Sequence, residues 1–244
     1  MSEILLFSAG LDSFPAWHYL GKPPILYFDS GHYGGQQEID TVRVLAAAHG
    51  MDLEISSELD LSRRATPQGD LIPFRNVLFA MLAAFRADVI WCIGVKGDHT
   101  ADKSPEAFAR MSEMLTAFAG RSIRVDSPFW DMTKSEIVAW YLKAGLPVDD
   151  LLQTFSCATP GAAFTHCGRC PSCLRRWIAL ANNDIDTSGH FASPPWNWDR
   201  IRTYYLPTMA RGVYPAHRVE EFHRAMATVG ITRHDGPRTP REEQ

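Results

Sequence analysis

The chain has 244 residues, 45% of them apolar, which is long enough for one large α/β domain with a small appendage. Its net charge is −4 at pH 7, and we expect no direct nucleic-acid binding because a broad nucleic-acid-binding face usually requires the opposite sign. No basic, apolar leader opens the sequence and no apolar run approaches roughly 18 residues, so we expect neither export nor a membrane span. Four of the five cysteines lie within residues 157–173, which favours a metal site in a reducing cytoplasm over disulfides.

The first predicted strand, residues 3–7, ends in a turn that leads into a helix. The turn reads Ser8-Ala9-Gly10-Leu11-Asp12-Ser13. A strand, turn and helix in this order place backbone N–H groups and the positive end of the helix dipole at one point, which suits a phosphate. Gly10 allows close approach of a ligand, and Asp12 is expected to face Mg²⁺ or to cap the helix. The turn is not a Walker loop because no Gly-Lys-Ser/Thr follows, and an ordinary turn with a Ser or Asp cap is the alternative.

Four more strands alternate with helices along the next 120 or so residues. The predicted strands cover residues 25–28, 52–56, 88–95 and 122–126, and the helices cover 36–49, 77–87, 105–119 and 133–145. Such alternation is typical of a doubly wound, mostly parallel five-stranded sheet in the α/β class. The loops at 8–13, 29–35 and 94–103 all follow strands, so they gather at the carboxyl edge of the sheet, where ligands bind.

Two helix starts carry candidate functional residues. Arg75 and Asn76 open the helix at 77–87, and the simpler interpretation is an Asn76 N-cap beside a solvated Arg75. Thr133 begins a capping-box pattern, and Lys134 falls in the first turn, where a lysine opposes the helix dipole. We therefore expect an anionic partner for Lys134. Cys92, inside a strongly apolar strand, is expected to be a core residue and not a ligand.

The strongest local pattern is a set of four cysteines with the spacing Cys-x9-Cys-x2-Cys-x2-Cys. They are Cys157, Cys167, Cys170 and Cys173. Four thiolates that close together predict a tetrahedral Zn²⁺ site of the closed, structural kind. An iron–sulfur cluster is the rival, although no other redox feature accompanies it. His166 could replace one cysteine, but four sulfurs suffice.

Taken in order, these motifs resemble a known family. The turn at residues 8–13 resembles the SGGxDS pyrophosphate loop of the ATP-pyrophosphatase group. Over about residues 3–183, the order and spacing resemble the 7-cyano-7-deazaguanine synthase family of the queuosine pathway. The further motifs are Arg75-Asn76, Gly94-Val95, Asp98, Asp102, Pro105-Glu106, Thr133-Lys134, Ser156-Cys157 and Cys167-Gly168-Arg169-Cys170-x2-Cys173.

The resemblance implies a domain organisation in three parts. Residues 1–145 would form an ATP-pyrophosphatase domain with an adenine-nucleotide α-hydrolase-like fold. Residues 146–186 would form a small zinc-bound subdomain, and residues 187–244 would be a C-terminal extension that the family pattern does not cover.

The resemblance also implies a cytoplasmic ATP-dependent ligase that forms a C–N bond. The substrates would be 7-carboxy-7-deazaguanine, ammonia and ATP. The carboxylate is adenylated, ammonia displaces AMP, and a second ATP activates the amide for dehydration to 7-cyano-7-deazaguanine. Mg²⁺ is expected with ATP, and Zn²⁺ with the four cysteines.

Site residues follow from the same resemblance, position by position. Nucleotide contacts are implied for Ser8, Ala9, Gly10, Leu11, Asp12, Ser13, Arg75, Asn76 and Gly94. Catalytic roles are implied for Asp12, Asp98 and Lys134, and substrate contacts for Lys96, Asp98, Asp102 and Glu106.

The chemistry of a deazaguanine suits some of these residues. Its edge of N–H donors can be accepted by a buried carboxylate such as Asp98 or Asp102, and an unpaired buried acceptor would discriminate strongly against other ligands. Lys96 and Arg75 are the available positive charges for a carboxylate or an acyl-adenylate. For Lys96 and Asp102, solvated loop charges are an equally good explanation.

The sequence departs from the family pattern mainly on the substrate side. Ala9 replaces the first glycine of the loop, which requires a negative φ at that position. The segment between Asp98 and Glu106 is two residues shorter before its second Asp than the usual form, and Lys96 stands where the family commonly has Asn.

Three other functions stay open. The chain could transfer an activated 7-deazaguanine to a protein or another macromolecular amine, for example in a defence system. It could act in tRNA thiolation, which shares the ATP loop but normally needs catalytic cysteines. It could also be a non-catalytic, nucleotide-binding zinc module. A homodimer, and a protein partner for residues 187–244, are likewise left open by the sequence.

Overall fold

The computed structural model describes residues 1–31, 35–64, 72–98, 100–158 and 165–231. Residues 32–34 and position 99, which belong to the predicted loops at 29–35 and 94–103, and the end of the C-terminal extension lie outside the described residues. None of the helices within the described part of the chain has the length and apolar character needed to cross a membrane.

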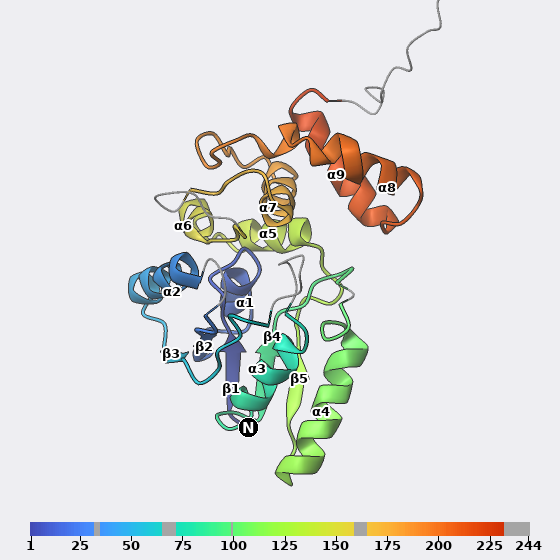
Figure 1. Cartoon of the computed structure of the whole chain (residues 1–244). Helices are drawn as coiled ribbons and strands as arrows, with labels where there is room; N and C mark the ends of the chain where they lie inside the picture. Colours follow the sequence, from blue (N-terminus) through green and yellow to red (C-terminus); the bar gives the residue numbers. More distant parts are fainter. Residues whose placement is uncertain (32–34, 65–71, 99, 159–164, 232–244) are drawn as a thin grey trace, which may run out of the picture.

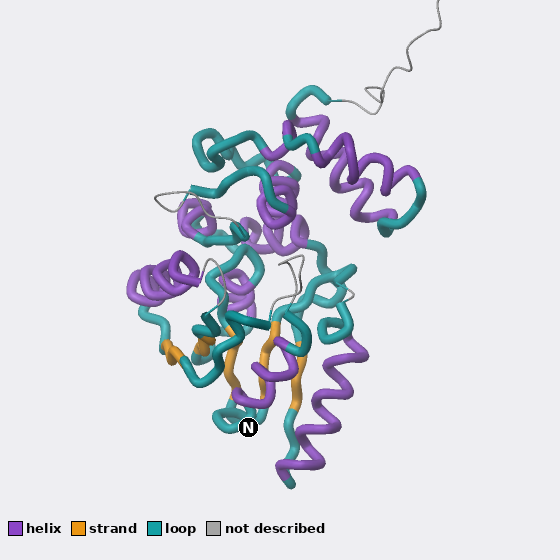
Figure 2. Tube along the Cα trace, in the orientation of Figure 1, coloured by secondary structure: helices purple, strands orange, loops and turns teal. Residues whose placement is uncertain are grey.

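One five-stranded sheet forms the centre of the N-terminal part (Figures 1 and 2). Its strands are β1 (Glu3–Leu6), β2 (Ile25–Phe28), β3 (Leu53–Ser56), β4 (Val89–Cys92) and β5 (Arg124–Asp126). The strand order is β3-β2-β1-β4-β5, and all four neighbouring pairs are parallel. The predicted α/β class and doubly wound sheet are confirmed. The strand order reverses between β1 and β4, which is where such sheets bind ligands.

Helices alternate with these strands and continue beyond them. They are α1 (Ser13–Tyr19), α2 (Gly35–His49), α3 (Arg75–Ala83), α4 (Pro105–Ala119), α5 (Lys134–Lys143), α6 (Val148–Gln153), α7 (Pro171–Ala181), α8 (Leu206–Ala210) and α9 (Ala216–Thr228). A 3₁₀ turn, η2 (Pro195–Asn197), and a π-helical turn, η3 (Ile201–Tyr205), precede α8. Within the extension, the sequence predicts only one helical stretch, near residues 216–229. It corresponds to α9, and α8 and the turns before it were not predicted.

The two faces of the sheet carry separate apolar cores because successive side chains of a strand point to opposite faces. Leu5 and Ile25 lie in the core that includes residues of α1, α2 and α5. Ile4 and Leu26 lie in the core that includes residues of α3 and α4. Cys92 belongs to the second core, as the sequence predicted.

The starts of α5 and α3 show one confirmed and one wrong prediction. At α5 the capping box is present, with the Thr133 hydroxyl accepting from the Glu136 N–H at 3.2 Å and the Glu136 carboxylate accepting from the Thr133 N–H at 2.7 Å. At α3 the N-cap is Phe74, in the left-handed region with φ of 62°, so the expected Asn76 cap is wrong. The backbone N–H of Asn76 donates instead to the carboxylate of Asp102 at 3.1 Å. That contact supplies from a distant loop what a local cap would have provided.

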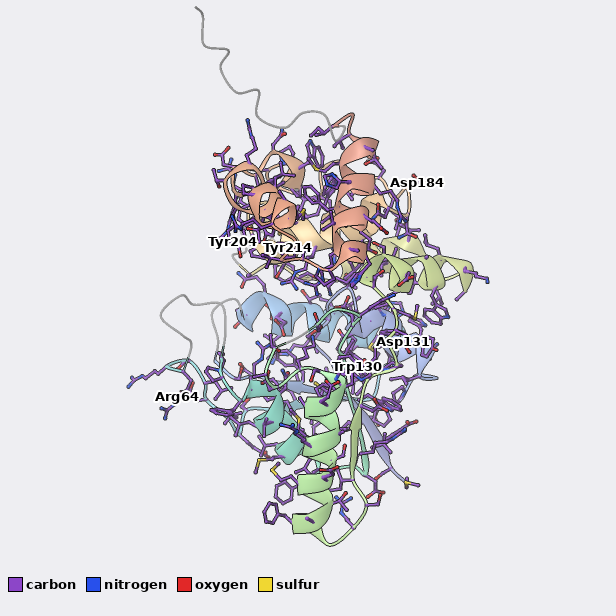
Figure 3. The ribbon with its side chains drawn as sticks, turned by 90° about the vertical axis from the view of Figure 1, so that its right-hand side faces the viewer. Arg64, Trp130, Asp131, Asp184, Tyr204 and Tyr214 are labelled. Carbon is purple, nitrogen blue, oxygen red and sulfur yellow. The ribbon has the colours of Figure 1, made fainter. Side chains whose placement is uncertain are left out.

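The C-terminal part, α7 to α9, lies beyond the carboxyl ends of the strands (Figure 1). Leu174 and Trp177 of α7 share one core with Ile201 and with Phe222 of α9. Aromatic packing continues through the segment before α9, where the Tyr205 ring lies 5.3 Å from that of Tyr204 and 6.1 Å from that of Tyr214. Figure 3 shows Tyr204 and Tyr214 in this part of the molecule. The described residues of the extension are therefore folded onto α7.

Candidate active site

The turn between β1 and α1 is held by its own last residue. The hydroxyl oxygen of Ser13 accepts from the backbone N–H of Ser8 at 3.3 Å and from that of Gly10 at 3.1 Å. Ala9 is fully buried and has a φ of 52°, so the expectation of a negative φ at this position is wrong. The turn keeps the left-handed conformation that a glycine adopts without strain, and Ala9 adopts it at a cost of roughly 1–2 kcal/mol.

Asp12 and Lys134 form an ion pair beside this turn. Asp12 precedes α1, but its side chain makes no capping hydrogen bond, so the capping alternative for this residue is wrong. One carboxylate oxygen accepts from Lys134, and the other, Oδ1, is buried and has no hydrogen-bond partner among the described residues. The predicted anionic partner of Lys134 is thus confirmed, and it is a carboxylate of the same chain.

The environment of Lys134 disfavours its charge despite this pairing. Burial lowers the pKa of Lys134, and the positive charges of Arg175 and Lys103 lower it further, while Asp12 acts in the opposite direction. Several cations therefore surround the carboxyl ends of β1 and β4.

A second segment, residues 154–156, covers the turn. The Phe155 N–H donates to the Ala9 carbonyl at 2.8 Å, and the Leu11 N–H donates to the Ser156 hydroxyl at 3.4 Å. The nucleotide-loop candidates are therefore tied directly to the chain that leads into the cysteine cluster. This contact joins positions 145 residues apart and could not be predicted from either segment alone.

Arg176 of α7 braces that covering segment from inside. The residue is only 1% exposed. Its guanidinium donates to the Thr154 hydroxyl at 2.7 Å and to the carbonyls of Leu151 and Leu152 at 3.2 and 3.1 Å. Burial lowers the pKa of Arg176 to about 9. Its position on the apolar face of α7, between Leu174 and Trp177, was the signal that it is an internal brace.

The loop after β4 is organised around Asp98. The Asp98 carboxylate accepts from the Val95 N–H at 3.3 Å and pairs with Lys103 at 3.1 Å and with Arg218 at 3.5 Å. Burial opposes ionisation of this group, but the charges of Lys103 and Lys134 outweigh it, so the pKa of Asp98 lies below its usual value. Asp98 is therefore an anion held among three cations.

The other predicted substrate residues have different surroundings. One carboxylate oxygen of Asp102 accepts from the Asn76 N–H, and the other accepts from the Thr100 hydroxyl at 3.3 Å. Asp102 therefore fixes the conformation of the loop and of the start of α3. Lys96, Arg75 and Glu106 have exposed side chains. They differ in this from Asp98, whose side chain is only 14% exposed.

Gly94 is required for packing. A Cβ on Gly94 would lie 2.1 Å from the Trp130 ring. The Gly94 carbonyl accepts from the Ser127 hydroxyl at 2.6 Å. The absence of a side chain at this position therefore has a structural reason, beside the nucleotide contact that the sequence implied.

The four cysteines meet as predicted. Their Sγ atoms all lie within 4.8 Å of one another, and those of Cys167 and Cys173 are 3.9 Å apart. A tetrahedral Zn²⁺ with Zn–S bonds of about 2.3 Å separates its sulfurs by roughly 3.8 Å, so the cluster could hold this ion. His166 is not one of the group, and its Nε2 accepts from the Ser156 N–H at 3.2 Å. The ligand set that fits is therefore the four thiolates.

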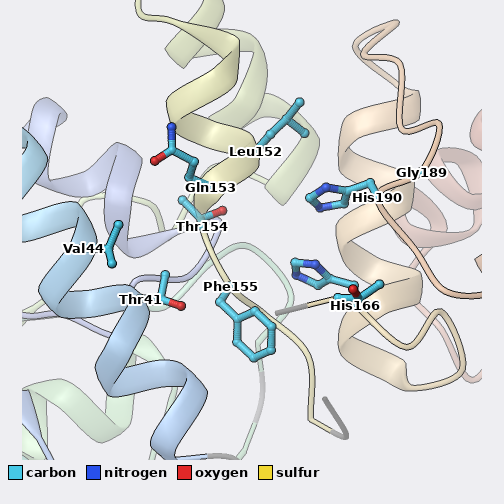
Figure 4. Close-up of a pocket in the computed structure, with 10 residues that line it drawn as sticks. Thr41, Val44, Leu152, Gln153, Thr154, Phe155, His166, Gly189 and His190 are labelled. Carbon is cyan, nitrogen blue, oxygen red and sulfur yellow. The ribbon is translucent and has the colours of Figure 1, made fainter. Parts of the chain in front are cut away.

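A cavity that the sequence did not predict is lined in part by the covering segment (Figure 4). Its volume is about 360 Å³, and the residues that line it are Thr41, Val44, Leu152, Gln153, Thr154, Phe155, Thr165, His166, Gly189 and His190. The rings of His166 and His190 stack with centroids 4.6 Å apart. Burial lowers the pKa of His190 to about 4, and His190 accepts from Arg176 at 2.9 Å. The pair is therefore neutral and supports Arg176.

Comparisons with known proteins agree with the family expected from the motifs. A family model described as "Queuosine biosynthesis protein QueC" matches residues 36–184. The matched range contains the Asp98 loop, Lys134 and the four cysteines. It begins after the turn at residues 8–13 and ends before η2, α8 and α9.

Curated relatives carry the name 7-cyano-7-deazaguanine synthase. The one from Marinobacter nauticus is 27% identical, and the alignment covers 75% of this chain and 94% of that protein. The one from Rickettsia akari is 32% identical over 126 residues, which is 47% of this chain and 54% of that protein. A solved structure titled as a predicted subunit of tRNA methyltransferase from Methanocaldococcus jannaschii gives a TM-score of 0.38 at 14% identity, covering 62% of this chain and 92% of that one.

The family match spans more than half of the 244 residues and includes the four clustered cysteines and the loop after β4. The chain belongs to the family described as queuosine biosynthesis protein QueC.

Proposed function

We propose that this protein converts 7-carboxy-7-deazaguanine and ammonia into 7-cyano-7-deazaguanine at the expense of ATP. The observation that carries the proposal is the Asp12–Lys134 pair beside the turn at residues 8–13, at the point where the strand order reverses. In an open α/β sheet this is the position that takes a nucleotide. The names of the curated relatives supply the substrate class.

The reaction proceeds in two activations. The substrate carboxylate attacks the α-phosphorus of ATP, which releases pyrophosphate and leaves an acyl-adenylate. Ammonia attacks the acyl carbon, loses a proton, and displaces AMP to give the amide. The amide oxygen then attacks the α-phosphorus of a second ATP, again releasing pyrophosphate. Loss of the two amide protons and departure of AMP form the nitrile, so the two oxygens of the acid leave in two AMP molecules.

The residues of the turn bind and orient the nucleotide in this proposal. The backbone N–H groups of Ser8 and Gly10, which meet the Ser13 hydroxyl, are donors in the turn that leads into α1. Lys134 neutralises phosphate charge as pyrophosphate departs. The Oδ1 atom of Asp12, without a partner among the described residues, fits an oxygen ligand for Mg²⁺, which when bound would compensate the charge of the phosphates.

The cysteine cluster has a structural part. A metal held by four thiolates has no open position, so it does not bind substrate. It would fix the chain between Cys157 and α7, which in turn holds the covering segment on the turn through Arg176 and Ser156.

A second product is favoured by the extension. Ammonia requires no additional protein surface, yet α9 lies against Asp98 through Arg218. A related enzyme that makes the same acyl-adenylate and passes the acyl group to a macromolecular amine would explain an added element there. The amine nitrogen would attack the acyl carbon, lose a proton and displace AMP, leaving an amide and consuming one ATP.

The test is to count AMP against product. The purified chain is incubated with ATP, Mg²⁺, ammonium and 7-carboxy-7-deazaguanine, and AMP and nitrile are measured by chromatography and mass spectrometry. We expect AMP only when the acid is present, and two AMP for each nitrile formed. One AMP for each acid consumed, with a stable amide on an added amine, would favour the second product. AMP formation independent of the acid, or none at all, would contradict both.

A further inference from the structure

Helix α9, outside the matched family range, contacts both segments that carry the central charges of the site. Arg218 donates to the Gly97 carbonyl at 2.8 Å and lies 3.5 Å from the Asp98 carboxylate. One turn further on, the Glu221 carboxylate accepts from the Thr133 hydroxyl at 2.6 Å. The helix thus connects the loop after β4 with the residue that precedes Lys134.

The loop is shaped to receive this helix closely. Gly97 has a φ of 85°, and a Cβ on it would lie 3.0 Å from His217 Nε2 and 3.1 Å from Arg218 Nε. A side chain at residue 97 would push against two residues of α9. The close approach therefore depends on glycine at this position.

The cations around the site lie close enough to oppose one another's charge. Burial, followed by the charge of Arg175, lowers the pKa of Arg218. Arg175 and Lys103 act in the same direction on Lys134. Bringing like charges together costs free energy that an anion would recover.

Two observations indicate that a ligand completes this arrangement. Asp12 Oδ1 and His217 Nε2 are buried polar atoms without a hydrogen-bond partner among the described residues. Such atoms are rare unless a ligand, ion or water meets them. Asp98 is meanwhile shared by Lys103 and Arg218, so it is poorly placed to accept from a base edge as well.

We propose that α9 forms part of the active centre and that Arg218, positioned by Asp98 and the Gly97 carbonyl, binds the carboxylate of the acid substrate. This inference rests on the proposed function. Both contacts of Arg218 use Nη2 alone, and a guanidinium has five N–H donors, so its planar fork retains donors for a carboxylate. Arg75 and Lys96, the cations expected from the sequence, are exposed instead.

The test compares three changes at Arg218 with a change on the same helix. Arg218→Ala removes the side chain, Arg218→Gln keeps a donor for the Gly97 carbonyl but no charge, and Arg218→Lys keeps the charge without the fork. Arg224→Ala alters an exposed arginine of α9 and serves as the matched control. AMP formation is measured against varied 7-carboxy-7-deazaguanine and, separately, against varied ATP, and each variant is also checked by thermal unfolding.

We expect Arg218→Ala and Arg218→Gln to raise KM for the acid by about tenfold or more, because a hydrogen-bonded charge partner is lost, with KM for ATP unchanged. Arg218→Lys should lie between these and the parent, Arg224→Ala should match the parent, and added guanidinium ion should partly restore Arg218→Ala.

Other outcomes overturn the inference in distinguishable ways. Equal increases of both KM values in Arg218→Gln, together with a lower Tm, would leave Arg218 with a structural role alone. Parent kinetics in all three variants would remove α9 from the active centre while the proposed function stands. A parent protein that forms no AMP with the acid would overturn the proposed function and this inference together.

Discussion

The ammonium group of Lys134 meets the carboxylate of Asp12 although the two residues are 122 positions apart in the chain. Lys134 lies in the first turn of α5, where a cation opposes the helix dipole, and Asp12 lies at the start of α1. The pair explains why a lysine is tolerated at this helix start. It also places one cation and one carboxylate beside the turn that we assign to the nucleotide.

Removing either member of this pair should slow adenylation. Lys134→Ala and Asp12→Asn should each cost about 2–4 kcal/mol of transition-state stabilisation, the scale for one positioned electrostatic group. The measurement is acid-dependent AMP formation, with Lys143→Ala, an exposed lysine at the other end of α5, as the control. If both variants form AMP at the parent rate, the assignment of the turn is wrong.

The cysteine cluster should carry one Zn²⁺ per chain. Cys170→Ser should lose the metal and lower Tm by roughly 10 °C, because a structural zinc site supplies several kcal/mol of folding free energy. Cys92→Ala is the matched control, since Cys92 is a buried thiol of β4 outside the cluster, and it should retain the metal. Elemental analysis and thermal unfolding provide the readouts. Iron with sulfide, or active protein without any metal, would refute this prediction.

Substitutions at Gly97 and Gly120 separate the effect of close packing against α9 from the effect of backbone strain. Both have positive φ, 85° and 64°, but only Gly97 faces other residues, His217 and Arg218. Each change to alanine should cost about 1 kcal/mol or more through strain. Gly97→Ala should also displace α9, so its Tm should fall further and its KM for the acid should rise, while Gly120→Ala should keep the parent KM. Equal behaviour of the two variants would show that α9 does not need the close contact.

His18 should make stability depend on pH between about 6.5 and 4. Burial lowers the pKa of His18 from 6.5 to about 4, helped by Lys22 and His49, and its Nε2 is buried without a partner among the described residues. In this range the unfolded chain binds a proton that the folded chain does not, so stability rises with pH. About 2 kcal/mol should be lost on acidification from pH 7 to pH 4, after allowance for partial solvent exposure.

The measurement is the free energy of unfolding by urea at several pH values, for the parent and for His18→Phe. The phenylalanine ring cannot titrate, so the difference between pH 7 and pH 4 should be smaller in the variant. An identical pH dependence in the two proteins would assign the acid sensitivity to other groups.

The sequence by itself determined the features that depend on neighbouring residues. Apolar runs of strand length alternating with helical spacing led to the five strands, because burial on a two-faced sheet imposes that pattern locally. The capping box at Thr133 and the four-cysteine spacing were readable for the same reason. In each of these motifs, the residues that interact lie within a few tens of residues of one another.

Only the tertiary structure decided how these pieces meet. Ala9 adopts a positive φ against the expectation from the sequence. The pairing of Asp12 with Lys134 and the contact of Arg218 with Asp98 join segments that carry no local sign of one another. The last two link residues 122 and 120 positions apart. The sequence around a charged loop residue does not show whether its side chain is solvated or buried. Chain packing determines which partner the side chain meets. Packing also sets the free-energy cost of leaving the charge unpaired.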